Sequence, residues 1–338
     1  MTQGIVLALL LSVALQPILL PLLRRLGMVD VPSHRSSHTS PVPRGGGVAV
    51  VVAVVVAVLL SAELSAASTA FLGAVVAFGV LGLIDDKVSL SATGRLTAQL
   101  VLACLAVAVL MSGVVGAPGR TIVERGAWAT VFVAVLVAYT NAFNFMDGVN
   151  GISALNALVS GGYLAALALA EGLDGLAIVA VVLAAAAAGF LPWNFPRARV
   201  FLGDVGAYAL GAGLALVAVG LSGSGVAWWW CLAPFVVYLT DTGVALVKRL
   251  AGRRPWREAH REHVYQQIFD AGGGHVAAAL LPAVATSVVC CAALVARLSS
   301  SPVGLVLAVV ATAGATLVYL ALPRLLQRSG SLAGGPTW

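Results

Sequence analysis

Charged residues are scarce in this sequence. Only 9% of its 338 residues are Asp, Glu, Lys or Arg, whereas 60% are hydrophobic and the mean hydropathy is +1.02. A soluble globular domain carries about 25% charged residues, so the composition excludes that class. Because apolar runs repeatedly reach the roughly 20 residues needed to cross a bilayer, the sequence predicts a polytopic membrane protein.

Several catalytic and metal-binding motifs are also missing. The four cysteines all lie in apolar segments and form no CxxC pair, which argues for buried thiols and against a zinc site or a disulfide framework. The sequence contains no GxxxxGK[ST], no GxGxxG after a strand pattern and no GxSxG, and HREH (residues 260–263) lacks the order of HExxH. P-loop, Rossmann, serine-hydrolase and zinc-protease chemistry therefore have no support.

The apolar runs define a single transmembrane domain that covers residues 1–338. Hydropathy predicts an all-α fold of about eleven spans. Their centres lie near residues 14, 54, 75, 107, 134, 162, 182, 214, 235, 285 and 312.

The distribution of basic residues predicts the orientation of these spans. If the N-terminus lies outside, the connecting segments on the cytoplasmic side hold 16 of the 19 Lys and Arg residues, leaving Arg120, Arg125 and Arg297 outside. This partition satisfies the positive-inside rule and places the C-terminus in the cytoplasm. The net charge of +6 then follows from membrane sidedness, and no nucleic-acid partner is expected.

Polar residues gather at the predicted cytoplasmic ends of the spans. The stretch NAFNFMDGVNG (residues 141–151) contains three of the five asparagines of the chain beside Asp147, directly after an apolar run. Four more polar segments fall on the same side of the membrane. Because intramembrane and interfacial ionisable groups usually mark function or pairing, these segments predict a composite cytoplasmic active site.

The stretch GLIDDKVSLSATGR (residues 82–95) places Asp85 and Asp86 at a span exit, followed by Lys87. Adjacent carboxylates suit Mg²⁺, which commonly uses one or two of them and keeps waters or substrate phosphates as its other ligands. A solvated helix end is the structural alternative.

The stretch FPRARVFLGDVGAYALG (residues 195–211) places Asp204 between two glycines, after Arg199. Glycines let the backbone approach a ligand closely, and a following helix could offer free N–H groups to a phosphate. An ordinary loop with cytoplasmic arginines remains the alternative.

Two further segments are basic. DVPSHRSSHTSPVPRGGG (residues 30–47) carries Arg35 and Arg44, and arginine offers fixed bidentate donors for phosphate. The predicted cytoplasmic loop 245–273 carries six basic residues between residues 248 and 261, together with His260 and His263 as directional donors. A flexible basic surface loop and contacts with anionic lipid headgroups are the respective alternatives.

Together the motifs resemble the polyprenyl-phosphate N-acetylhexosamine-1-phosphate transferases. HRSSHTSPVPRGGG, IDDK, NAFNFMDGVNG, FLGDVG and HREH occur in the order found in that family, over most of the chain. The resemblance implies a bacterial inner-membrane enzyme that depends on Mg²⁺, with Mn²⁺ as an alternative ion. Such an enzyme transfers sugar 1-phosphate from a UDP-N-acetyl sugar to undecaprenyl phosphate and releases UMP.

The resemblance also implies roles for individual residues. The predicted catalytic residues, which double as metal ligands, are Asp85, Asp86 and Asp204. The predicted substrate-binding residues are Arg35, Arg44, Lys87, Asn141, Asn144, Asp147, Asn150, Arg199, His260 and His263. Within this set, Asn141, Asn144 and Asp147 correspond to the family's nucleotide motif, and the two histidines to its sugar and diphosphate loop.

The sequence departs from the family at two points. Asn150 stands where many members carry a second aspartate, and the histidine motif HREHVYQQ is closer to the O-antigen-initiating branch. That branch often uses 6-deoxy-N-acetylhexosamines, so the sequence leaves the identity of the transferred sugar open. It also leaves open whether the protein forms a homodimer. A transporter is the competing class, but transporter sites lie near the bilayer midplane, whereas the aspartates here lie at span ends.

Overall fold

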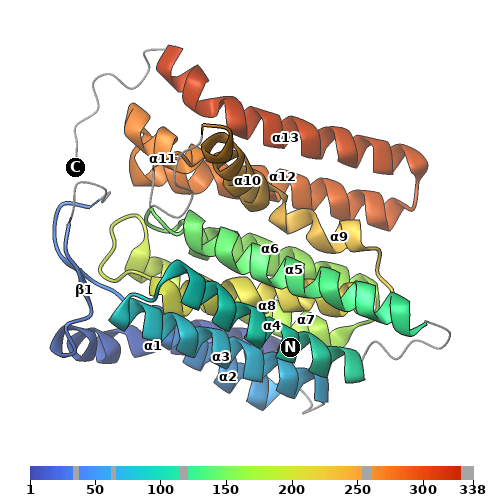
Figure 1. The fold of residues 1–338 in the computed structure, drawn as a ribbon, viewed down its shortest axis with the longest axis horizontal. Helices are drawn as coiled ribbons and strands as arrows, with labels where there is room; N and C mark the ends of the chain where they lie inside the picture. Colours follow the sequence, from blue (N-terminus) through green and yellow to red (C-terminus); the bar gives the residue numbers. More distant parts are fainter. Residues whose placement is uncertain (33–37, 62–65, 114–120, 253–260, 329–338) are drawn as a thin grey trace.

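The computed structural model describes residues 1–32, 38–61, 66–113, 121–252 and 261–328, and these are almost entirely helical (Figure 1). The helices are α1 Thr2–Arg25, α2 Gly47–Ser61, α3 Ala66–Val88, α4 Ala92–Gly113, α5 Ile122–Met146, α6 Ile152–Ala170, α7 Asp174–Asn194, α8 Gly203–Gly223, α9 Trp228–Leu232, η1 Ala233–Phe235, α10 Val236–Ala251, α11 Val264–Ile268, η2 Phe269–Gly273, α12 Gly274–Ser299 and α13 Pro302–Arg328.

The helices confirm the all-α polytopic fold predicted from the sequence. In the described part of the chain, ten helical segments are long and apolar enough to cross a membrane, and α2 is apolar but shorter. Each of the eleven predicted span centres lies within a helical segment. The sequence did not predict a short antiparallel hairpin, β1 (Val29–Asp30) with β2 (Val42–Pro43).

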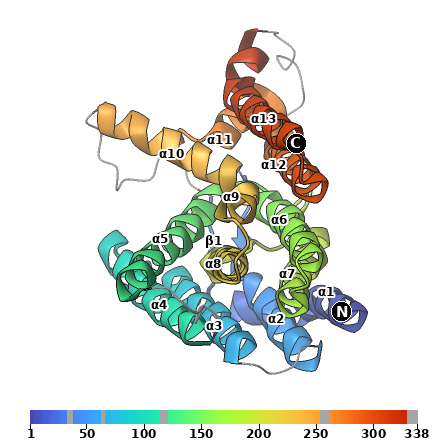
Figure 2. The ribbon, with the colours of Figure 1, turned by 90° about the vertical axis from the view of Figure 1, so that its right-hand side faces the viewer.

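The predicted span near residue 235 is broken into α9, η1 and α10. Pro234 lies at the start of η1, where its missing N–H costs no helical hydrogen bond. Beyond this break, α10 diverges from the bundle (Figure 2). It continues to Ala251 and α11 begins at Val264, so the loop predicted over 245–273 is shorter than expected.

Helix α8 forms the centre of the bundle, with α2, α3, α5, α6 and α7 packed around it (Figure 2). Almost every residue of α8 is buried. The alanine-rich run at residues 184–189 behaves similarly: Ala184–Ala187 are buried, and Gly189 lies against the backbone carbonyl of Leu9. Small residues thus allow close helix packing.

The helix connections sort the polar segments to one end of the bundle. The C-terminal ends of α5 and α7 and the N-terminal ends of α6 and α8 lie together there, near the hairpin (Figure 1). Exposed Trp228 and Trp229 start α9 at the opposite end, a position that suits an interfacial aromatic belt. The polar segments therefore meet in space.

We expect the end that carries the hairpin to face the cytoplasm. In a variant with all four native cysteines replaced, Ser40→Cys and Ser224→Cys form a matched pair, since both serines are exposed and lie at opposite ends. A membrane-impermeant maleimide should label Ser40→Cys only in inverted vesicles and Ser224→Cys only from outside. The reverse pattern would contradict the orientation.

Candidate active site

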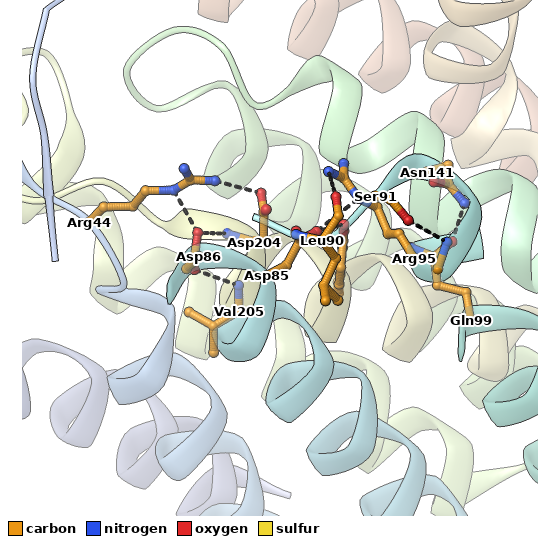
Figure 3. A network of polar contacts seen from close by, with 12 residues as sticks. Arg44, Asp85, Asp86, Leu90, Ser91, Arg95, Gln99, Asn141, Asp204 and Val205 are labelled. Carbon is orange, nitrogen blue, oxygen red and sulfur yellow. Dashed lines mark hydrogen bonds and ion pairs between the residues drawn. The ribbon is translucent and has the colours of Figure 1, made fainter. Parts of the chain in front are cut away.

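An arginine joins two carboxylates from different helices at the polar end of the bundle (Figure 3). The Arg44 Nε lies 2.6 Å from Asp86 Oδ1, and its Nη2 lies 2.8 Å from Asp204 Oδ1. The side chain of Asp86 is fully buried, whereas Arg44 stays 37% exposed. The two carboxylates thus share one guanidinium, which stays partly exposed to solvent.

Backbone pairing places Arg44 beside this pair of helices. The Phe201 N–H donates to the carbonyl of Pro43 at 2.8 Å, and the N–H groups of Gly45 and Gly46 donate back to the carbonyl of Phe201. Arg44 and Phe201 also form a parallel β-bridge. The PRGGG segment is therefore fixed against the segment that contains Asp204, although about 160 residues separate them in the sequence.

Asp86 also caps the N-terminus of α8. Its two oxygens accept the backbone N–H groups of Asp204 at 2.9 Å and Val205 at 3.1 Å, an arrangement that a helix N-terminus favours. Glycine is needed at two neighbouring positions: Gly203 has φ +75°, and a Cβ on Gly82 of α3 would collide with the backbone of Asp204. The first turn of α8 is thus pressed onto the end of α3.

Asp85, the other member of the pair, points into the protein. Its carboxylate accepts the Tyr208 hydroxyl at 2.7 Å and the Leu90 N–H at 2.9 Å, and it lies 2.9 Å from Arg95 Nε. These contacts tie α3 to α4 and α8 (Figure 3). The structure therefore gives Asp85 a bracing position, and its role as a metal ligand stays a prediction from the sequence.

A polar cavity of about 410 Å³ opens beside the Arg44 bridge. Its walls come from the hairpin, the α5–α6 turn and the start of α8. The residues that line it are Asp30, His38, Arg44, Asn144, Asp147, Gly148, Val149, Asn150, Asn194, Phe201, Leu202, Gly203 and Asp204.

The nucleotide motif divides between this cavity and the bundle interior. Asn144 and Asp147 line the cavity, and their role in nucleotide binding stays a prediction. Asn141 does not, because its amide donates to Gln99 Oε1 at 2.5 Å and to the Val137 carbonyl at 2.8 Å (Figure 3). The structure thus makes Asn141 a link between α4 and α5.

Asn150 and Asn194 hold the cavity wall together. The Asn150 amide donates to the Pro196 carbonyl at 3.0 Å, and its backbone N–H donates to His275 Nδ1 at 3.1 Å. Asn194 accepts the Gly151 N–H and donates to the carbonyl of Val200. A carboxylate at position 150 could not donate to Pro196, which explains an amide there.

Two predicted phosphate contacts lie outside the main cavity. Arg199 is exposed and stacks 5.6 Å above the Trp193 ring. Lys87 borders a smaller cavity of about 140 Å³, which Asp30 and Arg44 also line. Arg44 therefore separates two adjoining cavities, only one of which reaches Lys87.

The histidine segment packs behind the cavity wall. His263 is 5% exposed and does not line the cavity; its Nδ1 lies 3.1 Å from Asp241 Oδ1. His260 and Arg35, both predicted to bind substrate, lie outside the residues that the structure describes.

The structure adds cavity residues that the sequence did not single out. Asp30 and His38 belong to the basic segment 30–47, and His38 packs edge-on against Phe201, with ring centroids 4.9 Å apart. Asn194 is one of only five asparagines in the chain, and the scarcity of this residue type was the signal that could have identified it. Phe201 is the first residue of the FLGDVG motif, but an apolar side chain at that position gave no sign by itself of a place in the cavity wall.

Burial and charge set the ionisation of the groups outside the spans. Burial raises the pKa of Asp147 to about 6, Arg44 partly offsets this, and Asp86 adds to it. The carboxylate of Asp147 is therefore fully ionised only above that pH. For Arg44, burial lowers the pKa, but Asp204 and Asp86 outweigh it and raise the pKa above its ordinary value.

The donor set fits a magnesium ion held chiefly by water and substrate phosphates. Among the residues that the structure describes, no group of three or more His, Cys, Asp or Glu could hold a metal ion. Asp204 and Asp147 do line one cavity, and one or two carboxylates are enough for Mg²⁺ when phosphates complete its ligands. The site does not fit an all-protein metal cage.

We expect Gly82→Ala to destabilise the site because the new Cβ would displace the first turn of α8. Overpacking of this kind costs about 1–3 kcal/mol. Gly73→Ala in the same helix is the matched control, since nothing lies within 4 Å of its Cβ position. The melting temperature in detergent should fall for Gly82→Ala alone, and equal values for both variants would contradict the close packing.

Comparisons with known proteins agree with this geometry. The family model of glycosyl transferase family 4 matches residues 68–222. Decaprenyl-phosphate N-acetylglucosaminephosphotransferase of Mycolicibacterium smegmatis is 31% identical over 76% of this chain and 72% of its own length.

Two other relatives carry different names. A probable undecaprenyl-phosphate N-acetylglucosaminyl 1-phosphate transferase of Bacillus subtilis is 28% identical over 80% of this chain and 79% of its own length. Phospho-N-acetylmuramoyl-pentapeptide-transferase of Geobacillus kaustophilus is 34% identical over 64% of this chain and 75% of its own length. This chain therefore belongs to glycosyl transferase family 4, among the polyprenyl-phosphate N-acetylhexosamine-1-phosphate transferases.

Proposed function

We propose that this enzyme transfers N-acetylhexosamine 1-phosphate from a UDP-sugar to undecaprenyl phosphate and releases UMP. The observation that carries the proposal is the Arg44 bridge to Asp86 and Asp204, which stands between two polar cavities at one end of a membrane bundle. Transfer between two anions requires positioning and charge neutralisation, and this arrangement supplies both.

N-acetylglucosamine is the sugar that the relatives favour. The names of the Mycolicibacterium and Bacillus proteins both include it. The sequence expectation of an O-antigen-like glycan and a 6-deoxy sugar rests on the HREHVYQQ motif alone, so UDP-N-acetylglucosamine is the first donor to test. A 6-deoxy analogue is the second, and decaprenyl phosphate is the alternative acceptor.

We assign the two substrates to the two cavities. The larger one, lined by Asn144 and Asp147, offers amide and carboxylate groups that can recognise a uracil or ribose edge. The smaller one, bordered by Lys87 and Arg44, suits the phosphate of the lipid acceptor. Arg44 lines both cavities and can contact the phosphates of both substrates.

The bond changes follow from this placement. An oxygen of the lipid phosphate attacks the phosphorus attached to the sugar, and a new P–O–P bond forms. The bond from that phosphorus to the bridging oxygen breaks, and UMP carries the oxygen away. Arg44 stabilises the charge on the transferring phosphoryl group, and the first turn of α8 presents Asp204 beside it.

A bound Mg²⁺ or Mn²⁺ would supply further neutralisation of the diphosphate. Asp204, which lines the larger cavity, is the residue that would hold it, and Asp147 faces the same cavity. Both oxygens of Asp86 are already bonded, to Arg44 and to the backbone N–H groups of Asp204 and Val205.

We place the enzyme in the bacterial inner membrane, with its N-terminus in the periplasm and its cavities facing the cytoplasm. A transporter would concentrate its polar groups near the bilayer midplane. Here every stretch that lines the main cavity lies at a helix end or in a connection. The geometry therefore favours surface chemistry with a lipid substrate.

Purified enzyme with undecaprenyl phosphate, Mg²⁺ and UDP-N-acetylglucosamine should release UMP. We expect Asp204→Asn to lower kcat about a hundredfold, because one fixed charge beside the transferring group is lost. Asp174→Asn, an exposed change at the other end of the bundle, is the matched control and should leave kcat unaltered. Equal activity of the two variants would remove Asp204 from the mechanism, and no UMP from any UDP-sugar would refute the reaction.

The raised pKa of Asp147 predicts an acid limb in the pH profile. If ionised Asp147 accepts hydrogen bonds from the nucleotide, kcat/KM should fall as the pH drops through about 6, because protonation removes the acceptor. Asp147→Asn should show a lower plateau without that limb. A limb that persists unchanged in Asp147→Asn would show that another group causes it.

A further inference from the structure

A buried carboxylate outside the family match joins three segments of the C-terminal half. Asp241, in α10, is 1% exposed and lies beyond residues 68–222. It accepts the Tyr319 hydroxyl of α13 at 2.7 Å and the Val264 N–H at 3.1 Å, and the His263 Nδ1 lies at 3.1 Å. Its charge is thus satisfied by donors from α13, from α11 and from the residue that precedes α11.

The contact with His263 fixes the imidazole. An ionised carboxylate only accepts hydrogen bonds, so a neutral imidazole that bonds to Asp241 carries its hydrogen on Nδ1. The hydrogen bond of one ring nitrogen determines whether the other carries a hydrogen. When the ring is neutral and Nδ1 carries the hydrogen, Nε2 is left as an acceptor. With both side chains almost fully buried, the ring has little freedom to turn away.

The same segment packs against the nucleotide motif. His263 stacks on Tyr265, with ring centroids 5.8 Å apart, and the Tyr265 hydroxyl donates to the Phe145 carbonyl at 3.1 Å. A Cβ on Gly148 would collide with that hydroxyl. Tyr265 therefore contacts Phe145 and Gly148, which lie on either side of Asp147 in the sequence. A displacement of His263 would therefore be passed to the turn that carries Asp147.

We propose that Asp241 is a positioning residue: it holds His263 in one tautomer and thereby sets the wall of the donor cavity that carries Asp147. Tyr319 extends this support to α13, the last helix that the structure describes. The proposal rests on the proposed function for its catalytic consequence, but the state of His263 can be measured without catalysis.

The first experiment measures the tautomer directly. Because the chain has only five histidines, ¹⁵N-histidine labelling in detergent and comparison with His263→Gln assign the His263 signals. At a pH where the ring is neutral, the wild type should show hydrogen on Nδ1. Asp241→Asn should shift the population toward the Nε2–H form. A wild-type ring with hydrogen on Nε2 alone overturns the proposal, even if the variant does not fold.

The second experiment is a double-mutant cycle on kcat/KM with UDP-N-acetylglucosamine. Asp241→Asn should lower kcat/KM about tenfold in the wild-type background and less than about twofold in His263→Ala, because a positioning residue acts through its partner. If the kcat/KM losses of the two single variants multiply in the double variant, Asp241 acts independently of His263, and the proposal is overturned.

A control separates positioning from general loss of stability. Tyr163→Phe removes a buried hydroxyl that donates to the Trp230 carbonyl at 2.8 Å, at the far end of the bundle. It should lower the melting temperature and leave kcat/KM unchanged. If wild-type enzyme releases no UMP, the proposed function fails, and the ¹⁵N experiment still decides the role of Asp241.

Discussion

The ion pairs of Arg44 with Asp86 and Asp204 are the contacts on which the site depends. Two carboxylates held close together at the end of an apolar bundle would repel each other, and burial would favour their neutral forms. The guanidinium opposes both effects, at 2.6 and 2.8 Å. Asp86 also caps α8, so the carboxylate that pairs with Arg44 fixes the first turn of the central helix as well. Charge balance and architecture are therefore coupled.

Close backbone approach makes that coupling geometrically feasible. Gly82 lets α3 lie against the backbone of Asp204, and Gly47 lets the start of α2 lie against Gly206. Three segments that are distant in sequence can then place their polar groups within hydrogen-bonding distance at the membrane surface. Larger side chains at these points would separate α2, α3 and α8, and the Arg44 bridge would span too wide a gap.

The few asparagines of the chain have two roles: they support the structure or line the cavity. Asn194 and Asn150 brace the wall through backbone groups, Asn141 joins two helices, and Asn144 and Asp147 line the cavity. In a protein with so few polar residues, each buried amide must find partners, since an unsatisfied polar group in an apolar interior is costly. This explains why the cluster of amides at the end of α5 includes Asn141, which does not line the cavity.

The sequence by itself determined the membrane class, the positions of the spans and the gathering of polar segments at one end, because hydropathy and alternation along the chain are local properties. Its ordered motifs also identified the family. Only the tertiary structure decided the partners of individual side chains. Asp85 braces Arg95 and Tyr208 while its neighbour Asp86 meets Arg44, and His263 is buried on Asp241. Adjacent residues on a helix point in different directions, and the groups that they meet come from segments up to about 120 residues away, so no local pattern could separate a brace from a cavity residue.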